Sequence, residues 1–390
     1  MKIRTVFVAV LLVVAAGPAL ATGSVAAAQP AAENPTVDAQ ETAFDCEFPI
    51  AVEDATGETV EIEEEPEEIV ILAPSVAQHV WEIGAQDKVT GMPVNQFTEY
   101  LEGSEERTHV LTEGEQGFDV PDTEVIIDLE PDLILSPNVT PEEAVDELRD
   151  SGETVFHYPL AGNFEDIMTL VERTGQLVGE CDEAAEVTED MAERIDIVEQ
   201  ATADVEEPRV FYDLGSTFTV NADAFEHELL TIAGADNIAA DVEAEFGGAY
   251  PQISAETVLD RDPEYVVTTD GAPLSDFAGY EDTTALQNDQ VIEVNGNYIS
   301  QHAPRTVDVL VEVAEELHPE AMEEARQDVA EDEDADDEAD EETDETTDET
   351  ADETVDEDTD DVADDDGPGL SVGAAVAALV ALALIATRRQ

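Results

Sequence analysis

Short apolar runs alternate with longer amphipathic stretches through the middle of the chain. Residues 46–66 alternate polar and apolar positions around a turn at 54–57, which predicts a β-hairpin. The apolar run at 69–73 predicts a buried strand, and the amphipathic stretch after it predicts a helix that ends at Gly84. Because strands and helices continue to alternate, we expect an α/β fold with parallel sheets.

Two sequence patterns occur twice, in the same order along the chain. The first pattern begins with an apolar helical turn and an Asp, continues with an acid-Pro pair and a second acid, and ends in an apolar strand. It occurs as VIIDLEPDLILS at 125–136 and as TVLDRDPEYVVTT at 257–269. EIGAQDKVTG at 82–91 is similar to TIAGADNIAA at 231–240. Because both repeats keep their order, they indicate two similar, Rossmann-like lobes.

A single helix is expected to join these lobes. Residues 182–207 contain neither Gly nor Pro and repeat apolar side chains at helical spacing. They predict one long backbone helix between an N-terminal lobe at 46–181 and a C-terminal lobe at 208–326. Such a helix would act as a stiff hinge, and a ligand cleft is expected between the lobes.

The charge of the chain limits both its partners and its environment. The 390 residues include 99 Asp and Glu against 13 Lys and Arg, a formal net charge of −86. That balance excludes an ordinary nucleic-acid binder, which needs a basic surface. Residues 331–366 hold 24 acids and no base, yet subtracting them still leaves −62. Acidity spread over a folded domain is typical of adaptation to molar salt, where the screening length is roughly 3 Å.

The amino terminus has the pattern of a secretory signal peptide. Lys2 and Arg4 precede an apolar run at 6–16, and small residues follow it. We therefore expect residues 1–28 to be a signal peptide, with cleavage after Ala21 or Ala28.

The carboxyl terminus has the pattern of a tether. An acidic stretch at 327–366 predicts a disordered stalk, because dense like charges repel one another. Residues 367–390 then form an apolar segment that ends in arginines, which predicts a membrane anchor. The layout resembles the haloarchaeal PGF-CTERM surface anchor, although Leu370 stands where that family usually has Phe. We expect the folded part to lie outside the cell, anchored at the outer face of the cell membrane.

Cys46 and Cys181 are the only cysteines, one at each end of the N-terminal lobe. In an exported chain they predict a disulfide, with two free buried thiols as the alternative. Two cysteines do not support a cysteine-ligated metal.

Five segments together resemble the substrate-binding proteins of ABC importers, of the helical-backbone class that binds cobalamin, siderophore-bound iron or haem. The segments are 67–92, 122–135, 225–241, 247–267 and 303–320. The resemblance implies a receptor, not an enzyme, without an intrinsic cofactor. It would deliver its ligand to a membrane permease that works with cytoplasmic ATPase subunits.

Candidate site residues follow from strand ends and from this resemblance. Ligands of open α/β sheets bind at the carboxyl ends of the strands, which selects Ser75, Val76, Ser136, His157, Tyr158 and Leu214. The resemblance adds Tyr250 and Arg305 as ligand contacts. It also implies that Glu142 and Glu256, one on each lobe, dock on the permease. The glycosylation sequon Asn138-Val139-Thr140 lies beside the first of these glutamates.

The composition favours one ligand over its alternatives. Between residues 46 and 326 there are only Lys88 and eight arginines, too few to assemble easily the basic cluster that an anionic ferric siderophore prefers. A large, mostly neutral corrinoid suits apolar and aromatic surfaces better. Cobalamin is therefore the first expectation, ferric siderophore the second and haem the third. The six histidines form no close-spaced pair, so no metal site is expected.

Two other classes of protein are the alternatives to a receptor. The sequence contains no GxSxG motif and no P-loop, which argues against the enzymes that carry them. A structural or adhesion protein would explain the anchor and the stalk, but it would not explain two similar α/β lobes.

Overall fold

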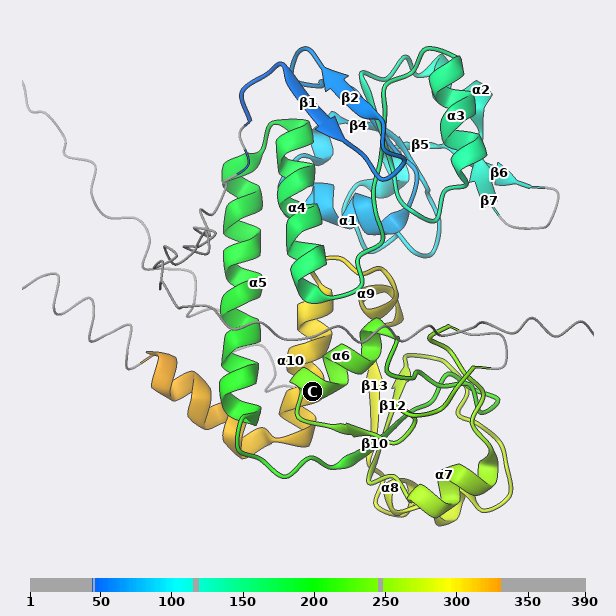
Figure 1. The fold of residues 1–390 in the computed structure, drawn as a ribbon, viewed down its shortest axis with the longest axis vertical. Helices are drawn as coiled ribbons and strands as arrows, with labels where there is room; N and C mark the ends of the chain where they lie inside the picture. Colours follow the sequence, from blue (N-terminus) through cyan, green and yellow to red (C-terminus); the bar gives the residue numbers. More distant parts are fainter. Residues whose placement is uncertain (1–43, 45, 115–118, 245–247, 331–390) are drawn as a thin grey trace, which may run out of the picture. The chain divides into compact units, whose positions relative to one another are not determined.

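The computed structural model describes residues 44, 46–114, 119–244 and 248–330 (Figure 1). They divide into two compact units. Unit 1 holds the described residues up to Ala192 together with Asn295–Val307, and unit 2 holds Glu193–Val294 and the described residues from Asp308 onward. The return of 295–307 to unit 1 differs from the predicted lobes, which assigned that segment to the second. The predicted signal peptide (1–28) and anchor (367–390) lie outside the described residues.

Unit 1 is built on a five-stranded parallel sheet in the order β5-β4-β3-β8-β9. Its strands are β3 (Ile69–Ile71), β4 (Val89–Met92), β5 (Thr108–His109), β8 (Leu133–Ser136) and β9 (Val155–His157). Ile69 pairs with Leu133, and Ile134 pairs with Val155. All residues of β3, β8 and β9 are buried. Burial on both faces explains why these strands are continuous apolar runs and do not alternate.

The helices of unit 1 begin and end where local sequence signals place them. They are α1 (Pro74–Glu82), η1 (Gln86–Lys88), η2 (Ser104–Glu106), α2 (Thr123–Asp128), α3 (Glu142–Asp150), α4 (Phe164–Val178) and α9 (Gly296–Ser300). Pro74 is the first residue of α1, where its missing N–H leaves no hydrogen bond unmade. The Asn163 side chain accepts a hydrogen bond from Asp166 N and so caps α4, which ends at the left-handed Gly179.

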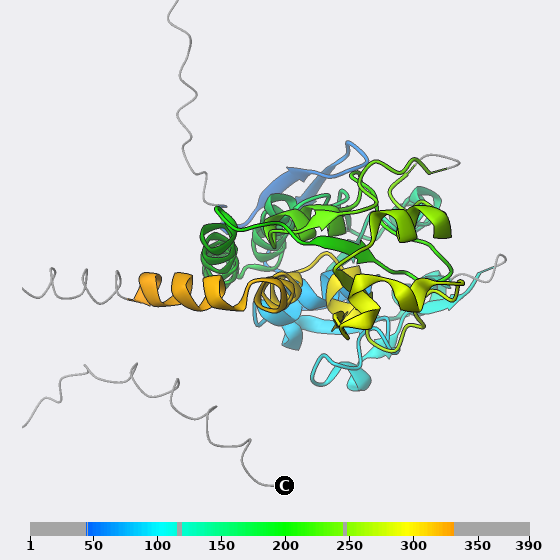
Figure 2. The ribbon, with the colours of Figure 1, turned by 90° about the horizontal axis from the view of Figure 1, so that it is seen from below.

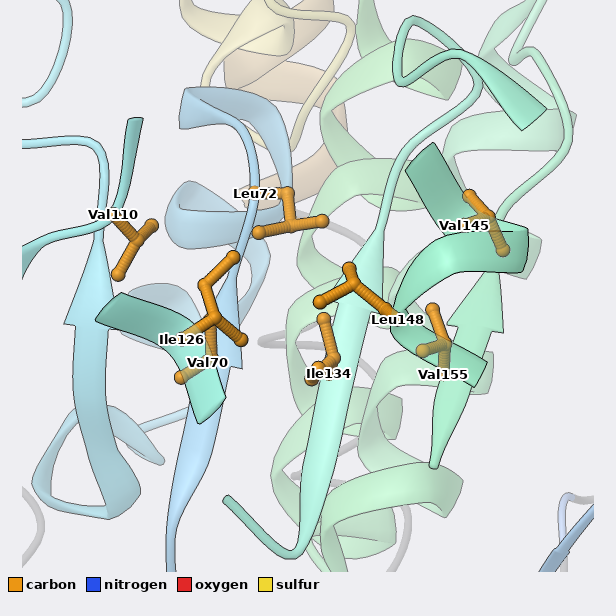
Figure 3. Close-up of a cluster of buried hydrophobic side chains, with 8 residues drawn as sticks. All are labelled: Val70, Leu72, Val110, Ile126, Ile134, Val145, Leu148 and Val155. Carbon is orange, nitrogen blue, oxygen red and sulfur yellow. The ribbon is translucent and has the colours of Figure 1, made fainter. Parts of the chain in front are cut away.

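One core cluster of unit 1 lies between the central strands and the helices α2 and α3 (Figure 3). The strands and the segments that extend them contribute Val70, Leu72, Val110, Ile134 and Val155, and the helices contribute Ile126, Val145 and Leu148. Each fully buried side chain of this size stabilises the fold by about 1.5–3 kcal/mol relative to an exposed one. The cluster therefore holds the helices against the sheet and fixes the loops at its edge.

The predicted hairpin is confirmed. β1 (Ile50–Glu53) pairs antiparallel with β2 (Thr59–Ile62), and buried and exposed residues alternate along both strands. The Asp54 carboxylate accepts hydrogen bonds from Thr56 N and His157 N and forms an ion pair with Arg149. One buried acid thus fastens the hairpin turn to α3 and β9.

A second hairpin in unit 1, β6 (Leu111–Glu113) with β7 (Asp119–Pro121), was not predicted. Its strands are short and contain no buried residue, so the sequence carries little alternation there.

Unit 2 is built on a four-stranded parallel sheet in the order β11-β10-β12-β13. Its strands are β10 (Arg209–Tyr212), β11 (Asp236–Asn237), β12 (Tyr265–Thr269) and β13 (Val291–Val294). The short helices are α6 (Phe225–Ile232), α7 (Ala255–Arg261), η3 (Tyr280–Asp282) and α8 (Thr284–Gln287). The α/β prediction with parallel sheets is therefore confirmed in both units.

The last described segments are helical. The helix α10 (Thr306–Leu317) is followed by a further helix at 319–330, drawn in orange in Figure 1 and Figure 2. The first residues of the predicted disordered stalk, 327–330, therefore lie in a helix, and the rest of the stalk lies outside the described residues.

The predicted long helix is present as α5 (Cys181–Thr202), with Ala184, Met191, Ile195 and Val198 on its buried face. It ends five residues before the predicted end at 207. Residues 203–208 are turn or coil, and Pro208 disfavours the α conformation only at Glu207, so the earlier end at Thr202 depends on contacts beyond this local signal. The predicted disulfide is confirmed, since Cys46 and the first residue of α5, Cys181, are bonded within unit 1.

The first repeated sequence pattern corresponds to one hydrogen-bonding arrangement that occurs in both units. Asp132 N donates to Glu68 O at 2.8 Å, and the Asp132 carboxylate accepts from Glu67 N and Glu68 N. Glu264 N donates to Arg209 O at 2.7 Å, and the Glu264 carboxylate accepts from Arg209 N. Each acid after the proline therefore joins the start of its own strand to the start of the neighbouring strand.

The second repeated pattern also has one geometry. Gly84 after α1 and Gly234 after α6 have φ values of 74° and 73°. Ala85 N donates to Val80 O, and Ala235 N donates to Leu230 O, each at 2.9 Å. Glycine adopts this left-handed conformation without a Cβ clash, so it ends both helices in the same way.

Candidate functional site

The exposed apolar side chains lie at one kind of position in both units. Among the described residues, the large hydrophobic side chains that stay exposed are Phe97 (48%), Val139 (73%), Leu160 (64%), Leu214 (38%), Phe218 (46%) and Tyr250 (51%). All of them lie in loops that follow the carboxyl end of a strand, namely β4, β8, β9, β10 (Leu214 and Phe218) and β11. Open α/β sheets bind their ligands at this end, and exposed apolar surface marks interaction sites.

In unit 2 the apolar residues come from two neighbouring segments. Leu214 N donates to Phe218 O at 3.0 Å, which closes the loop 214–218 after β10. Phe218 forms a β-bridge with Gln252, and Thr219 N donates to Pro251 O. The loop 214–218 therefore lies against the segment that carries Tyr250.

Tyr250 is held at this rim by a buried acid. Its hydroxyl donates to the Glu226 carboxylate, at 3.3 and 3.4 Å from the two oxygens, and Glu226 is only 6% exposed. Burial, together with the negative charge of Glu226, raises the pKa of Tyr250 to about 12. The phenol therefore stays neutral at ordinary pH and keeps this hydrogen bond. Of the predicted ligand contacts in unit 2, both Leu214 and Tyr250 present exposed side chains.

Four of the predicted contacts in unit 1 have buried side chains. Val76, Ser136, His157 and Tyr158 are all less than 6% exposed. Ser136 Oγ lies 3.2 Å from His157 Nδ1, and burial lowers the pKa of His157 despite the nearby Asp54. Tyr158 OH lies 3.0 Å from Thr174 Oγ1, and burial raises the pKa of Tyr158 above its usual range.

In this arrangement these four side chains are covered by protein, and ligand contact by them stays a prediction. A strand end places a residue at the edge of the sheet but does not decide whether its side chain turns outward. The exposed neighbours Val139 and Leu160, which sequence reasoning missed, are better candidates. Ser75, the second residue of α1, is partly exposed.

Arg305 is already engaged inside unit 1. Its Nε donates to Glu82 at 2.6 Å and its Nη1 donates to Tyr298 OH at 3.0 Å. The guanidinium carbon lies 5.3 and 5.4 Å from the ring centroids of Tyr100 and Tyr298. Burial by itself would lower the pKa of Arg305, but Glu82 and Tyr298 outweigh burial and raise it. Arg305 is half-buried and its charge is compensated, so ligand contact by this residue stays a prediction.

The loop that carries Phe97 is fastened by the returning segment 295–307. Gln301 Nε2 donates to Phe97 O at 2.9 Å, and Tyr100 OH donates to Gln301 Oε1 at 2.6 Å. Asn297 Nδ2 donates to Gln96 O. These contacts fix the backbone of the loop while the Phe97 side chain remains exposed.

The two predicted docking glutamates are exposed in the first turns of helices. Glu142 is the first residue of α3 in unit 1, and Glu256 is the second residue of α7 in unit 2. An acid at either position also interacts favourably with the helix dipole. Asn138 of the sequon is exposed in the turn before α3.

Sequence reasoning did not select Phe97, Val139, Leu160 and Phe218, whose side chains are exposed. For Phe218 a signal was present, because an aromatic residue ends the short loop DLGSTF that follows an apolar strand. Across the described ranges, no group of three or more His, Cys, Asp or Glu side chains is placed to hold a metal ion. In the same part of the chain, no helix combines the length and apolarity needed to cross a membrane.

Comparison with known proteins identifies the family. The periplasmic binding protein family matches residues 69–298. A cobalamin-binding protein of Halobacterium salinarum is 34% identical over 319 residues, which cover 79% of this chain and 83% of that protein.

Solved structures share the fold. The periplasmic vitamin B12-binding protein BtuF of Vibrio cholerae superposes with a TM-score of 0.54 at 23% identity, covering 67% of this chain and 98% of that one. CeuE of Helicobacter pylori with Ni(II) bound gives a TM-score of 0.56 at 19% identity, covering 70% and 90%. The parallel sheets of both units agree with this likeness of fold. The chain belongs to the periplasmic binding protein family.

Proposed function

We propose that this chain binds cobalamin and delivers it to the membrane permease of an ABC importer, with no chemistry of its own. One observation carries the proposal. Among the described residues, every large apolar side chain that stays exposed lies in a loop that follows the carboxyl end of a strand. A corrinoid offers a broad, mostly neutral surface that such side chains can cover. The cobalamin-binding relative at 34% identity supports the same ligand.

A ferric siderophore is the alternative, and haem follows it. Anionic ligands of this kind need available cations. Seven of the nine Lys and Arg residues between 46 and 326 lie in ion pairs with acids: Lys88, Arg149, Arg194, Arg209, Arg261, Arg305 and Arg326. Cations that already neutralise acids are poorly available to an anionic ligand, which favours the corrinoid.

Titration of the full chain in molar KCl with cyanocobalamin, a ferric siderophore and haemin tests the proposal. One-site cobalamin binding with submicromolar affinity is expected. Phe218→Ala and Tyr250→Ala should each weaken it about tenfold, because buried aromatic anchors contribute more than about 1 kcal/mol each. Tyr265→Ala at the amino end of β12 is the matched control and should bind like the wild type. If only the ferric siderophore or only haemin binds tightly, that compound replaces cobalamin as the proposed ligand. If none of the three compounds binds, a structural or adhesion protein is favoured.

Docking on the permease is proposed to use Glu142 and Glu256. The double reversal Glu142→Lys with Glu256→Lys should abolish cobalamin uptake by whole cells while leaving ligand affinity in solution unchanged. Glu147→Lys with Asp260→Lys is the control, because these exposed acids lie on the same two helices. Equal uptake by both double variants would contradict the docking role.

We also propose that the folded part lies at the outer face of the cell membrane, held by residues 367–390. The sequence pattern of a signal peptide, an acidic stalk and an apolar end followed by arginines supports this location. Protease added to intact cells should release the folded part. If the folded part stays with the cells and is not cleaved by the added protease, the proposed location is contradicted.

A further inference from the structure

Asp213 forms a hub of hydrogen bonds at the carboxyl end of β10. Its side chain is buried, with the residue only 1% exposed. Oδ1 accepts from Gly215 N at 2.9 Å and from Ser275 Oγ at 2.6 Å. Oδ2 accepts from Ser275 N and from Tyr280 OH, both at 2.8 Å. All four donors are neutral groups: Gly215 lies in the loop after β10, Ser275 in the loop after β12, and Tyr280 at the start of η3.

The loop that Asp213 holds has an unfavourable backbone. Gly215, Ser216 and Thr217 have φ values of 84°, 52° and 63°, so three successive residues are left-handed. This conformation suits glycine but is costly for Ser and especially for a β-branched Thr. It persists only where the surroundings enforce it.

The surroundings here are the Asp213 hub and its partners. Thr217 N donates to Ser275 Oγ at 2.7 Å, and Ser275 Oγ in turn donates to Asp213. Gln252 Nε2 donates to Ser216 O at 2.9 Å. Every residue of the left-handed run is therefore tied by at least one hydrogen bond, and Asp213 accepts one directly and supports a second through Ser275.

The consequence of this backbone is the exposure of two apolar side chains. Leu214 and Phe218, at the two ends of the left-handed run, are 38% and 46% exposed. A relaxed loop would allow these side chains to fold back on the protein and cover each other, because exposed apolar area is unfavourable in water.

We propose that Asp213 is a positioning residue for ligand binding, which holds the loop 214–218 in the form that keeps Leu214 and Phe218 exposed to a ligand. The inference rests on the proposed function, and it adds a residue that never touches the ligand. Without the hub, binding must order the loop again, and each reordered side chain costs a factor of roughly two to ten in affinity.

Asp213→Asn, with Asp262→Asn as the matched control, tests the proposal. Asp262 also holds a loop of unit 2, since its carboxylate accepts from Thr284 N and Thr284 Oγ1, but it lies at the amino end of β12. Ser275→Ala is a second, milder variant that removes the acceptor of Thr217 N. Two measurements are made on each full chain: hydrogen exchange of the amides of Gly215, Thr217 and Phe218 without ligand, and cyanocobalamin dissociation by stopped flow.

Both Asp213→Asn and Ser275→Ala should speed exchange of these amides and weaken cobalamin binding about tenfold, mainly through faster dissociation, since each ordered side chain has that scale of cost. Asp262→Asn should lose stability but change neither readout. Unchanged exchange, or wild-type affinity in spite of faster exchange, would overturn the positioning role. If Asp213→Asn does not fold, Ser275→Ala decides by the same two criteria.

The exchange measurement also separates this inference from the proposed function. If the wild-type chain binds no cobalamin in the titration, the proposed function is refuted. In that case, faster exchange confined to Asp213→Asn and Ser275→Ala would still show that Asp213 holds the loop, whereas unchanged exchange would overturn that role as well.

Discussion

Acidification should destabilise unit 1 through a single buried histidine. His79 in α1 is 2% exposed, and its Nδ1 lies 3.3 Å from Thr174 Oγ1. Burial lowers the pKa of His79 from 6.5 to about 4, although a hydrogen bond with the His302 backbone offsets part of this effect. Between these two pKa values the unfolded chain binds a proton at this position and the folded chain does not.

The free energy of unfolding must therefore fall as the pH falls below 6.5. The contribution is fully present above that pH. Since one pKa unit corresponds to about 1.4 kcal/mol, the loss amounts to about 2 kcal/mol at about pH 5 and approaches roughly 3 kcal/mol near pH 4. Carboxylates titrate in part of the same range, so the measurement has to isolate the histidine.

The variant His79→Leu isolates the contribution of the histidine to the pH dependence, because leucine fills a similar volume and does not titrate. Urea unfolding in molar KCl at about pH 7 and about pH 5 gives the change in unfolding free energy for each variant. Trp81, the single tryptophan, lies two residues away in α1 and reports the unfolding of unit 1. The wild type should lose about 2 kcal/mol more than His79→Leu over this interval.

Val80→Ala is the control, because Val80 is a buried residue of the same helix that does not titrate. This variant should show the same pH dependence as the wild type. An equal loss of stability in wild type and His79→Leu would refute the argument, because it would assign the acid sensitivity to the carboxylates alone.

Three further outcomes are expected. Replacing both Cys46 and Cys181 by Ser should destabilise unit 1 by about 5 kcal/mol, because the bond joins residues 135 apart and loop-closure entropy grows with that separation; an unchanged urea midpoint would contradict this. Gly91→Ala should cost about 1–3 kcal/mol in the same assay, because a Cβ there would lie 2.6 Å from Val110 Cγ1 and 2.7 Å from Leu129 Cδ1. Glu226→Gln should lower the pKa of Tyr250 from about 12 part of the way to 10, as followed by phenolate absorbance against a Tyr250→Phe control, since a negative charge that raises this pKa is removed.

Much of the scaffold could be predicted from the sequence because it depends on local patterns. The hairpin around Asp54, the buried strand β3 and the helix α5 all follow from the spacing of apolar residues. The disulfide followed from having two cysteines in a chain with export signals. The return of 295–307 to unit 1 could not be predicted, because it depends on long-range contacts such as the one between Arg305 and Glu82.

The candidate site could be predicted only in part. The strand-end rule selects one edge of each sheet, and of the residues that this rule and the resemblance selected in unit 2, Leu214 and Tyr250 have exposed side chains. The direction of a side chain at a strand end depends on what packs above it. Tyr158, for example, turns inward to Thr174 and packs edge-on against Phe156, with ring centroids 4.9 Å apart. No pattern of neighbouring residues in the chain records those contacts.

Because the sequence contains so many Asp and Glu residues, the few buried acids that hold loops in place could not be recognised from it. Among the described residues, most Asp and Glu side chains are exposed or partly exposed, where their shared effect is charge. Asp54 and Asp213 differ because each directly follows a strand, β1 or β10, and turns its carboxylate inward to unpaired backbone N–H groups of the following loop. In both loops the carboxylate accepts from the backbone N–H two residues further along the chain, which fixes the turn. Molar salt screens the surface acids strongly and these buried ones far less. Lowering the salt should therefore weaken the fold through surface repulsion while leaving the loops held by Asp54 and Asp213 intact until unfolding.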